Sequence, residues 1–266
     1  MKYKLFISDF DGTLGSVPDI IQPQTVEAIH KFIAKGGKFV ICTGRMFASA
    51  KLICQKYGIN NAVVSFQGAS IDDLETGKVL LRDGISCDLA IKVANELKAE
   101  GYKVIADIDD IMFAEDITSW YVEFHKGFTS VVEVSDVTDA IRQKAMPVSK
   151  LVVVDQPQVV EKLTEKYSPK YAGQLVFNSG ADHLLEIINP NLSKGNAVRF
   201  LSKYYNIPLQ EVIAVGDSTN DVSLISGEWH GVAVGNAKET LKNVAKEVTV
   251  PFSEQPIKYL LEKYCL

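Results

Sequence analysis

The chain has 266 residues, of which 47% are hydrophobic and 23% are charged, and its formal net charge is −5 at pH 7. This composition is typical of one large or two smaller globular domains, and a negative chain without a Lys/Arg stripe argues against nucleic acid as a partner. No apolar run approaches the length of a membrane span, and too few apolar residues precede Asp9 for a signal-peptide core. Four scattered cysteines fit reduced thiols. We expect a cytoplasmic protein, monomeric or homodimeric, without membrane or nucleic-acid partners.

The first third of the chain alternates between strand and helix patterns. Short continuous apolar runs at 5–7, 39–41 and 62–66 predict strands of a parallel sheet that is buried on both faces. Between them, one helical pattern stops at Gly36 and Gly37, and a second runs from 46 to 57 and ends at Gly58. Strand, helix and strand in this order predict right-handed βαβ units of a Rossmann-like α/β domain.

The middle of the chain, residues 83–186, has a different pattern. Helical stretches at 88–100 and 159–167 alternate with strand-like runs, and two of these runs are joined by acidic turn residues. This predicts an inserted α+β domain with its own sheet. The strand-like runs lie at 102–106, 111–114, 131–134, 150–154 and 175–177.

The last part of the chain returns to the first pattern. Ser193 is a predicted N-cap for a helix, and strand-like runs follow at 212–216, 231–234 and 247–250. We assign these strands to the first sheet. The predicted domains are therefore a core of 1–82 with 187–266, and an insertion of 83–186.

Polar clusters follow three of the predicted core strands. Asp9 and Asp11 come after the first strand, Thr43-Gly44-Arg45 after the second, and residues 216–221 at the end of the run from 212. In an open α/β sheet, ligands bind outside the carboxyl ends of the strands. The sequence therefore predicts that the three clusters share one site.

The pair of Asp9 and Asp11 has two explanations other than the shared ligand site. An acidic turn that caps the next segment is one of them. A calcium loop is another, but its sixth position, which requires Gly, is Leu14, and its twelfth, which requires Glu, is Ile20. With Asp217 as a third carboxylate, the repulsion is several kcal/mol at roughly 4 Å for an effective dielectric of about 20.

A hard divalent cation would relieve this repulsion, and carboxylates with waters suit Mg²⁺. Thr43, Arg45 and Lys194 would then supply donors and positive charge to a phosphoryl group. Taken singly, Arg45 and Lys194 read as surface charges.

Four segments, in this order along the chain, resemble the motifs of a known family. They are Asp-Phe-Asp-Gly-Thr-Leu at 9–14, Thr-Gly-Arg at 43–45, Ser-Lys-Gly at 193–195 and Gly-Asp-Ser-Thr-Asn-Asp at 216–221. The set is similar to the four motifs of the haloacid dehalogenase superfamily of hydrolases. The insertion and Leu-Glu-Ile-Ile-Asn-Pro at 185–190 resemble the Cof-type phosphatases, which carry a large α+β cap for substrate specificity.

The resemblance implies a Mg²⁺-dependent phosphatase that acts on small phosphorylated metabolites, usually sugar phosphates, through an aspartyl-phosphate. Asp9 would be the nucleophile, and Asp11 the general acid and then the general base. Asp9, the backbone carbonyl of Asp11 and Asp217 would hold the metal. The other implied residues are Thr43, Gly44, Lys194 and Asn220 for phosphate binding, with Gly12, Thr13, Arg45 and Asp221 in supporting roles.

Two other functions stay open on the sequence. A phosphomutase for hexose phosphates could use the same Asp pair, and a phosphometabolite-binding protein could have lost catalysis. Gln67-Gly-Ala69 also departs from the Asn-Gly-Ala that many relatives have. Candidates for substrate contact in the insertion are Asp107, Asp109, Asp110, Trp120, Tyr121, His125, Asn178 and His183.

Overall fold

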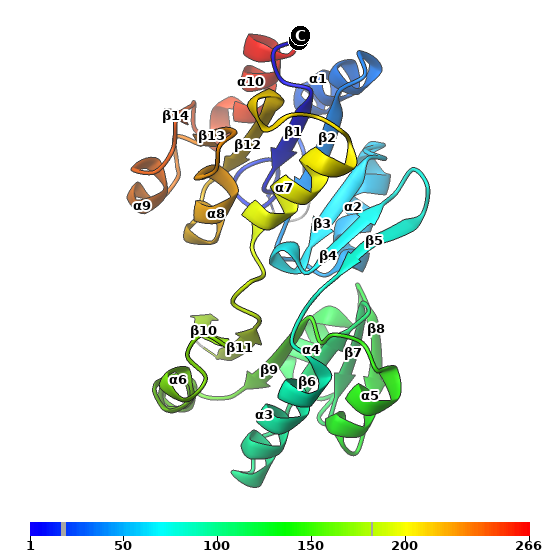
Figure 1. Ribbon diagram of the computed structural model, residues 1–266, viewed down its shortest axis with the longest axis vertical. Coiled ribbons are helices and arrows are strands. Elements are labelled where there is room, and N and C mark those ends of the chain that lie inside the picture. The colour runs from blue at the N-terminus through cyan, green and yellow to red at the C-terminus, as the bar shows by residue number, and fades with distance from the viewer. Residues whose placement is uncertain (17–19, 182) are drawn as a thin grey trace. The chain divides into compact units, whose positions relative to one another are not determined.

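The protein forms two compact units, seen here in a computed structural model that describes residues 1–16, 20–181 and 183–266 (Figure 1). The first unit joins Met1–Leu81 to Ser193–Leu266, and the second is Arg82–Leu192. The chain returns to the first unit at Ser193, later than the boundary at 186/187 that the sequence analysis drew. The reason is that Leu184–Ile188 forms a strand in the sheet of the second unit.

An eight-stranded sheet forms the centre of the first unit. Its order is β14-β13-β12-β1-β2-β3-β4-β5, and the pairs from β14 to β3 are parallel. The predicted Rossmann-like parallel core is therefore confirmed. The strands are β1 (Leu5–Ser8), β2 (Lys38–Cys42), β3 (Ala62–Ser65), β4 (Ser70–Asp73), β5 (Lys78–Arg82), β12 (Val212–Gly216), β13 (His230–Ala233) and β14 (Glu247–Val248).

β1 lies between β2 and β12, and all of its residues are buried. Its apolar run at residues 5–7 is typical of a strand that is buried on both faces of a sheet. β4 adds an antiparallel strand to β3, which the sequence analysis did not predict. The helices of this unit are α1 (Pro23–Ala34), α2 (Phe47–Tyr57), α7 (Lys194–Tyr204), α8 (Val222–Ile225), α9 (Glu239–Lys242) and α10 (Pro256–Tyr264).

The ends of two helices follow their predicted signals. Ser193 caps α7 by accepting a hydrogen bond from the Asn196 backbone N–H at 3.2 Å. Gly58 ends α2 in the left-handed conformation, at φ +65°, where a Cβ would be unfavourable. α1 begins at Pro23, because proline is well accommodated in the first turn, where no intrahelical N–H bond is lost.

The second unit has its own six-stranded sheet and its own apolar core, as the α+β pattern predicted. The strand order is β10-β11-β9-β6-β7-β8, antiparallel except for the β7–β8 pair. Its strands are β6 (Ile105–Ile108), β7 (Ile111–Ala114), β8 (Ser130–Glu133), β9 (Lys150–Val154), β10 (Val176–Ala181) and β11 (Leu184–Ile188). Its helices are α3 (Cys87–Ala99), α4 (Trp120–His125), α5 (Val137–Lys144) and α6 (Pro157–Lys170). Within the described ranges, no helix is long and apolar enough to cross a membrane.

Candidate active site

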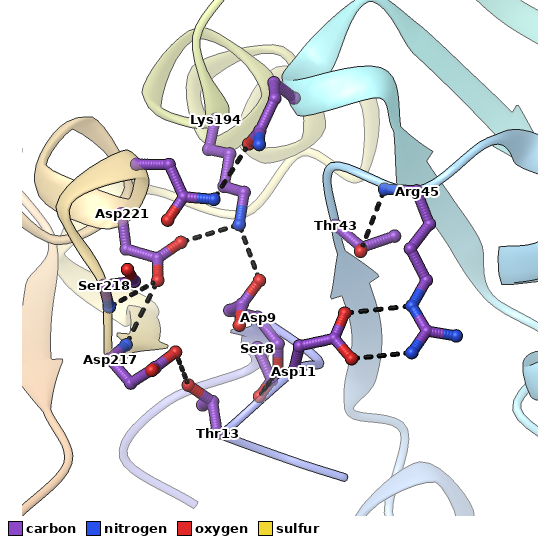
Figure 2. Close-up of polar contacts among 12 residues, drawn as sticks. Ser8, Asp9, Asp11, Thr13, Thr43, Arg45, Lys194, Asp217, Ser218 and Asp221 are labelled. Carbon is purple, nitrogen blue, oxygen red and sulfur yellow. Dashed lines mark hydrogen bonds and ion pairs between the residues drawn. The ribbon is translucent and has the colours of Figure 1, made fainter. Parts of the chain in front are cut away.

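The carboxyl ends of the adjacent strands β1 and β12 bring Asp9, Asp217 and Asp221 together. Asp11, which the sequence analysis expects beside Asp9 and Asp217, pairs with Arg45 instead. Asp9 follows β1, and Asp217 follows β12, which pairs with β1 in parallel. Asp221 lies one short turn beyond Asp217, in the 3₁₀ helix Thr219–Asp221. One carboxylate oxygen from each of the three lies within 4.8 Å of the others (Figure 2).

Lys194 neutralises part of this acidic cluster from inside the protein. Its Nζ donates to Oδ1 of Asp9 and to Oδ1 of Asp221, both at 2.6 Å, and the lysine side chain has no exposed surface. Burial alone would lower the pKa of Lys194, but the two carboxylates outweigh that effect and raise it. A charged lysine is therefore built into the site.

Asp9 is the most perturbed carboxylate of the site. Burial raises the pKa of Asp9 to about 7, Lys194 acts in the opposite direction, and Asp221 and Asp217 raise it further. Its backbone N–H donates to the Val215 carbonyl at 2.9 Å, which fixes the residue at the end of the sheet.

Asp221 uses both of its oxygens in hydrogen bonds within the protein. Oδ1 accepts from Lys194, while Oδ2 accepts from the backbone N–H groups of Asp217 and Ser218, each at 3.1 Å. The residue is fully buried. Asp221 therefore holds the 217–221 loop and Lys194 in place.

Asp217 is half-buried beside the turn that follows Asp9. Burial raises its pKa, and the neighbouring charge of Asp221 adds to the effect. The Thr13 hydroxyl donates to its Oδ1 at 3.0 Å. Gly12 has φ +82°, and a Cβ there would lie 2.8 Å from Oδ2 of Asp217. Glycine is therefore required at position 12 for both its backbone conformation and its lack of a side chain.

Asp11 points away from Asp9 and pairs with Arg45 (Figure 2). Nε and Nη2 of Arg45 donate to the two carboxylate oxygens at 2.9 and 2.6 Å. The guanidinium also lies 4.9 Å from the centroid of the Phe10 ring. Thr43, at the end of β2, is buried, and its hydroxyl accepts from the Arg45 backbone N–H at 3.2 Å.

Gln67 lies against both Gly44 and Asn220. The sequence analysis names Gln67 only because many relatives have Asn at this position. A Cβ on Gly44 would lie 2.4 Å from Nε2 of Gln67, and Nδ2 of Asn220 donates to Oε1 of Gln67 at 3.5 Å. Sequence reasoning missed Asn236, which donates to the Gly12 carbonyl at 3.1 Å and accepts from the Phe252 N–H at 2.7 Å. No motif signal marks Asn236, because its contacts join segments far apart in the sequence.

The eight candidates of the second unit differ in exposure. Asp107 and Tyr121 are buried, and Asp110 and His125 are half-buried. The exposed candidates are Asp109, Trp120, Asn178 and His183.

The carboxylates fit a hard divalent cation. Asp9, Asp217 and Asp221 offer only oxygen donors, which are the ligands that Mg²⁺ prefers. Because Asp221 uses both oxygens in internal hydrogen bonds, Asp9 and Asp217 are the better-placed ligands.

The protein has a parallel α/β core with an inserted second domain, and the lysine-bridged carboxylate cluster at its strand ends is of the kind that phosphoryl-transfer proteins use. The family model for haloacid dehalogenase-like hydrolases matches residues 6–261, so the chain belongs to this family. It is an enzyme of the phosphatase class, a hydrolase of phosphoric monoesters.

Relatives along the whole chain agree with this assignment. Phosphatase YwpJ of Bacillus subtilis is 27% identical, over 97% of this chain and 99% of its own. The 5-amino-6-(5-phospho-D-ribitylamino)uracil phosphatase YitU of the same organism is 26% identical, over 98% and 97%. A crystal structure from Thermotoga maritima superposes with a TM-score of 0.88 at 26% identity, covering 98% of this chain and 97% of that one.

Proposed function

We propose that the protein is a Mg²⁺-dependent phosphatase that hydrolyses small phosphorylated metabolites, with sugar phosphates as the substrate class, through an aspartyl-phosphate on Asp9. The observation that carries this proposal is the buried Asp9–Lys194–Asp221 arrangement, with Asp217 beside it. YitU, a relative named for a phosphorylated ribityl compound, supports a polyol or sugar ester. We expect the enzyme to act in the cytoplasm as a monomer or homodimer.

Asp9 would begin the reaction by attacking phosphorus. The bond from a carboxylate oxygen to phosphorus forms, and the bond from phosphorus to the ester oxygen breaks, so one hard displacement becomes two easier ones. Lys194 holds the Asp9 carboxylate in place from one side. Mg²⁺, held by Asp9, the Asp11 backbone carbonyl and Asp217, would offset the negative charge of the phosphoryl oxygens.

Asp11 would transfer a proton in each of the two steps. It would protonate the leaving alkoxide, and as a carboxylate it would then take a proton from the water that hydrolyses the aspartyl-phosphate. Because Arg45 engages both of its oxygens, the Asp11 carboxylate must leave Arg45 to reach the ester oxygen. Its half-exposed side chain, at 49%, leaves room for that rotation.

The phosphoryl oxygens would be bound by groups from three separate loops. The proposed donors are the Thr43 hydroxyl, the Gly44 backbone, the Lys194 ammonium and the Asn220 amide. Gly12, Thr13, Arg45 and Asp221 would support them by shaping the turn and holding the charged groups.

The test is release of inorganic phosphate from a panel of phosphorylated metabolites, with Mg²⁺ and with EDTA. Asp9→Asn should lower kcat by three or more orders of magnitude, roughly 4 kcal/mol or more of barrier, because a neutral amide is a far weaker nucleophile than a carboxylate. Asp139→Asn, an exposed carboxylate on α5, is the matched control and should keep wild-type activity. Persistent turnover in Asp9→Asn would contradict the mechanism. An isomeric phosphate without free phosphate would indicate a mutase instead.

A further inference from the structure

The turn that follows β3 has an unusual backbone. Phe66, Gln67 and Gly68 have φ values of +50°, +58° and +108°. Left-handed backbone costs on the order of 1 kcal/mol for a residue with a Cβ, and such residues gather at functional sites. This strained turn contacts three other segments of the site.

The backbone of the turn holds the loop after β2. The N–H of Phe66 donates to the Arg45 carbonyl at 2.9 Å, and the N–H of Gln67 donates to the Thr43 carbonyl at 3.1 Å. These bonds fix both ends of the 43–45 loop. The proposed phosphate donors Thr43 and Gly44 therefore depend on this turn for their position.

Gly68 brings the same turn against the start of α7. A Cβ at Gly68 would lie 2.7 Å from the Ser193 carbonyl oxygen, which no side chain could accept without movement of the backbone. Lys194 is the next residue after that carbonyl. The turn thus abuts the helix start that carries the buried lysine.

The side chain of Gln67 makes the third connection. Its Nε2 occupies the space in front of Gly44, and its Oε1 accepts from Nδ2 of Asn220 at 3.5 Å. Gln67 is half-buried, whereas Asn220 is exposed. An exposed amide without such an acceptor would sample several rotamers, so the contact with Gln67 favours one orientation of Asn220.

We propose that Gln67 is a positioning residue of the phosphate site: its amide fixes the orientation of Asn220 and fills the space in front of Gly44. The inference rests on the proposed function, because it takes Asn220 and Gly44 as binding groups for phosphoryl oxygens. Its consequence is that affinity for the phosphoryl group depends on a side chain that does not itself bind phosphate.

A pair of variants separates this role from a general effect on folding. Gln67→Ala removes the amide and leaves a residue that has a similar backbone cost at φ +58°. Gly44→Ala places a methyl group where Nε2 of Gln67 lies, so the flexible end of that side chain must move away. The double variant restores space for the methyl group, because the amide is then absent.

The measurement is the inhibition constant of inorganic phosphate, with KM and kcat for the best ester of the panel. Each single variant should raise that inhibition constant and KM about three- to ten-fold, the usual effect of one lost hydrogen bond, with a smaller change in kcat. The double variant should match the single variants rather than show the product of their effects. Gln24→Ala, an exposed glutamine on α1, is the matched control.

The outcomes are distinct. If Gln67→Ala lowers the thermal midpoint and leaves the inhibition constant unchanged, Gln67 has a structural role only and this inference is overturned. The inference is also overturned if the change in the inhibition constant of the double variant equals the product of the two single changes. If the wild type is active and the variants have the same inhibition constant and KM as the wild type, this inference alone is overturned. A wild type that releases no phosphate from any ester would overturn the proposed function and this inference together.

Discussion

Lys194 shows how much of the site depends on a single buried charge. Its ammonium touches two carboxylates and no solvent, so each group of the trio tolerates burial only because the others are present. Removing one member of a buried ion pair leaves the partner without compensation, which typically costs 3–5 kcal/mol.

We therefore predict that Lys194→Met lowers the free energy of unfolding by about 3 kcal/mol at pH 8. Lys203→Met removes an exposed lysine from the same helix and should change it by less than about 0.5 kcal/mol. Urea denaturation of both variants and the wild type measures the difference. Equal stability of the two variants would show that the Asp9–Lys194–Asp221 contacts do not operate in solution.

Gly12 offers a second residue-scale test, with a control that matches its backbone. Gly12 and Gly36 have φ values of +82° and +88°, but only Gly12 has a neighbour in the space where a Cβ would lie. Gly36→Ala should cost about 1 kcal/mol of stability and leave activity unchanged. Gly12→Ala should lose similar or greater stability and, by displacing the Asp217 carboxylate, at least about ten-fold in kcat/KM. Equal activity of the two variants would contradict the placement of Asp217.

At the scale of elements, three strands of the second unit bring a buried aspartate together with two half-buried charged residues. Asp107 on β6 pairs in register with Lys150 on β9, and Glu186 lies on the adjacent β11. Nζ of Lys150 donates to Glu186 at 2.6 Å and lies 3.9 Å from Asp107. Neither oxygen of Asp107 has a hydrogen-bond partner among the described residues. Burial raises the pKa of Asp107 to about 7, Lys150 opposes this, and Glu186 and Asp110 add to it.

The pH dependence of stability should reveal this group. An Asp that is unfolded titrates near pH 4, so between about pH 4 and 7 the folded state holds a proton that the unfolded state has lost. This contribution to stability is therefore greatest below about pH 4, falls as the pH rises from about 4 to 7, and is lost above 7. Tyr121 and His125 on α4 also face the cluster, but they do not change the sign.

Asp107→Asn should remove this dependence. Relative to the wild type, the variant should gain on the order of 1–3 kcal/mol of stability at pH 8 compared with pH 5. Asp109→Asn, an exposed neighbour, should show no such difference between the two pH values. Urea denaturation at both pH values gives the comparison, and a pH-independent effect of Asp107→Asn would show that Asp107 titrates normally.

Most elements could be predicted because their patterns are local. The apolar runs of β1, β2 and β12 are continuous, since helices cover both faces of the sheet. β4 was missed because its sequence, Ser-Ile-Asp-Asp, has little strand propensity. It is a strand because it pairs with β3, and Asp73 is held by the Tyr204 hydroxyl at 2.7 Å, a contact from α7.

At the scale of the whole molecule, the chain leaves one unit and returns to it. β1 has β2 on one side and β12 on the other, and β12 lies about two hundred residues later in the sequence. The second unit instead contains its complete sheet and a separate apolar core within one continuous segment.

The two segments should therefore fold differently in isolation. A fragment of residues 82–192 should show a cooperative thermal transition by circular dichroism, because its sheet and core are complete. A fragment of residues 1–81 should show none, since half of the neighbours of its central strand are missing. A non-cooperative 82–192 fragment would show that the second unit depends on the first.

The sequence by itself determined the class of the core sheet, the inserted domain and the order of the polar segments, because these depend on local periodicity and on which residues follow each strand. The tertiary structure decided how the polar residues engage one another. Lys194, which reads singly as a surface charge, is buried between Asp9 and Asp221, Arg45 holds Asp11, and Gln67 reaches Asn220. These contacts join residues far apart in the chain, and no local pattern specifies a partner that only the packing of strand ends brings within reach.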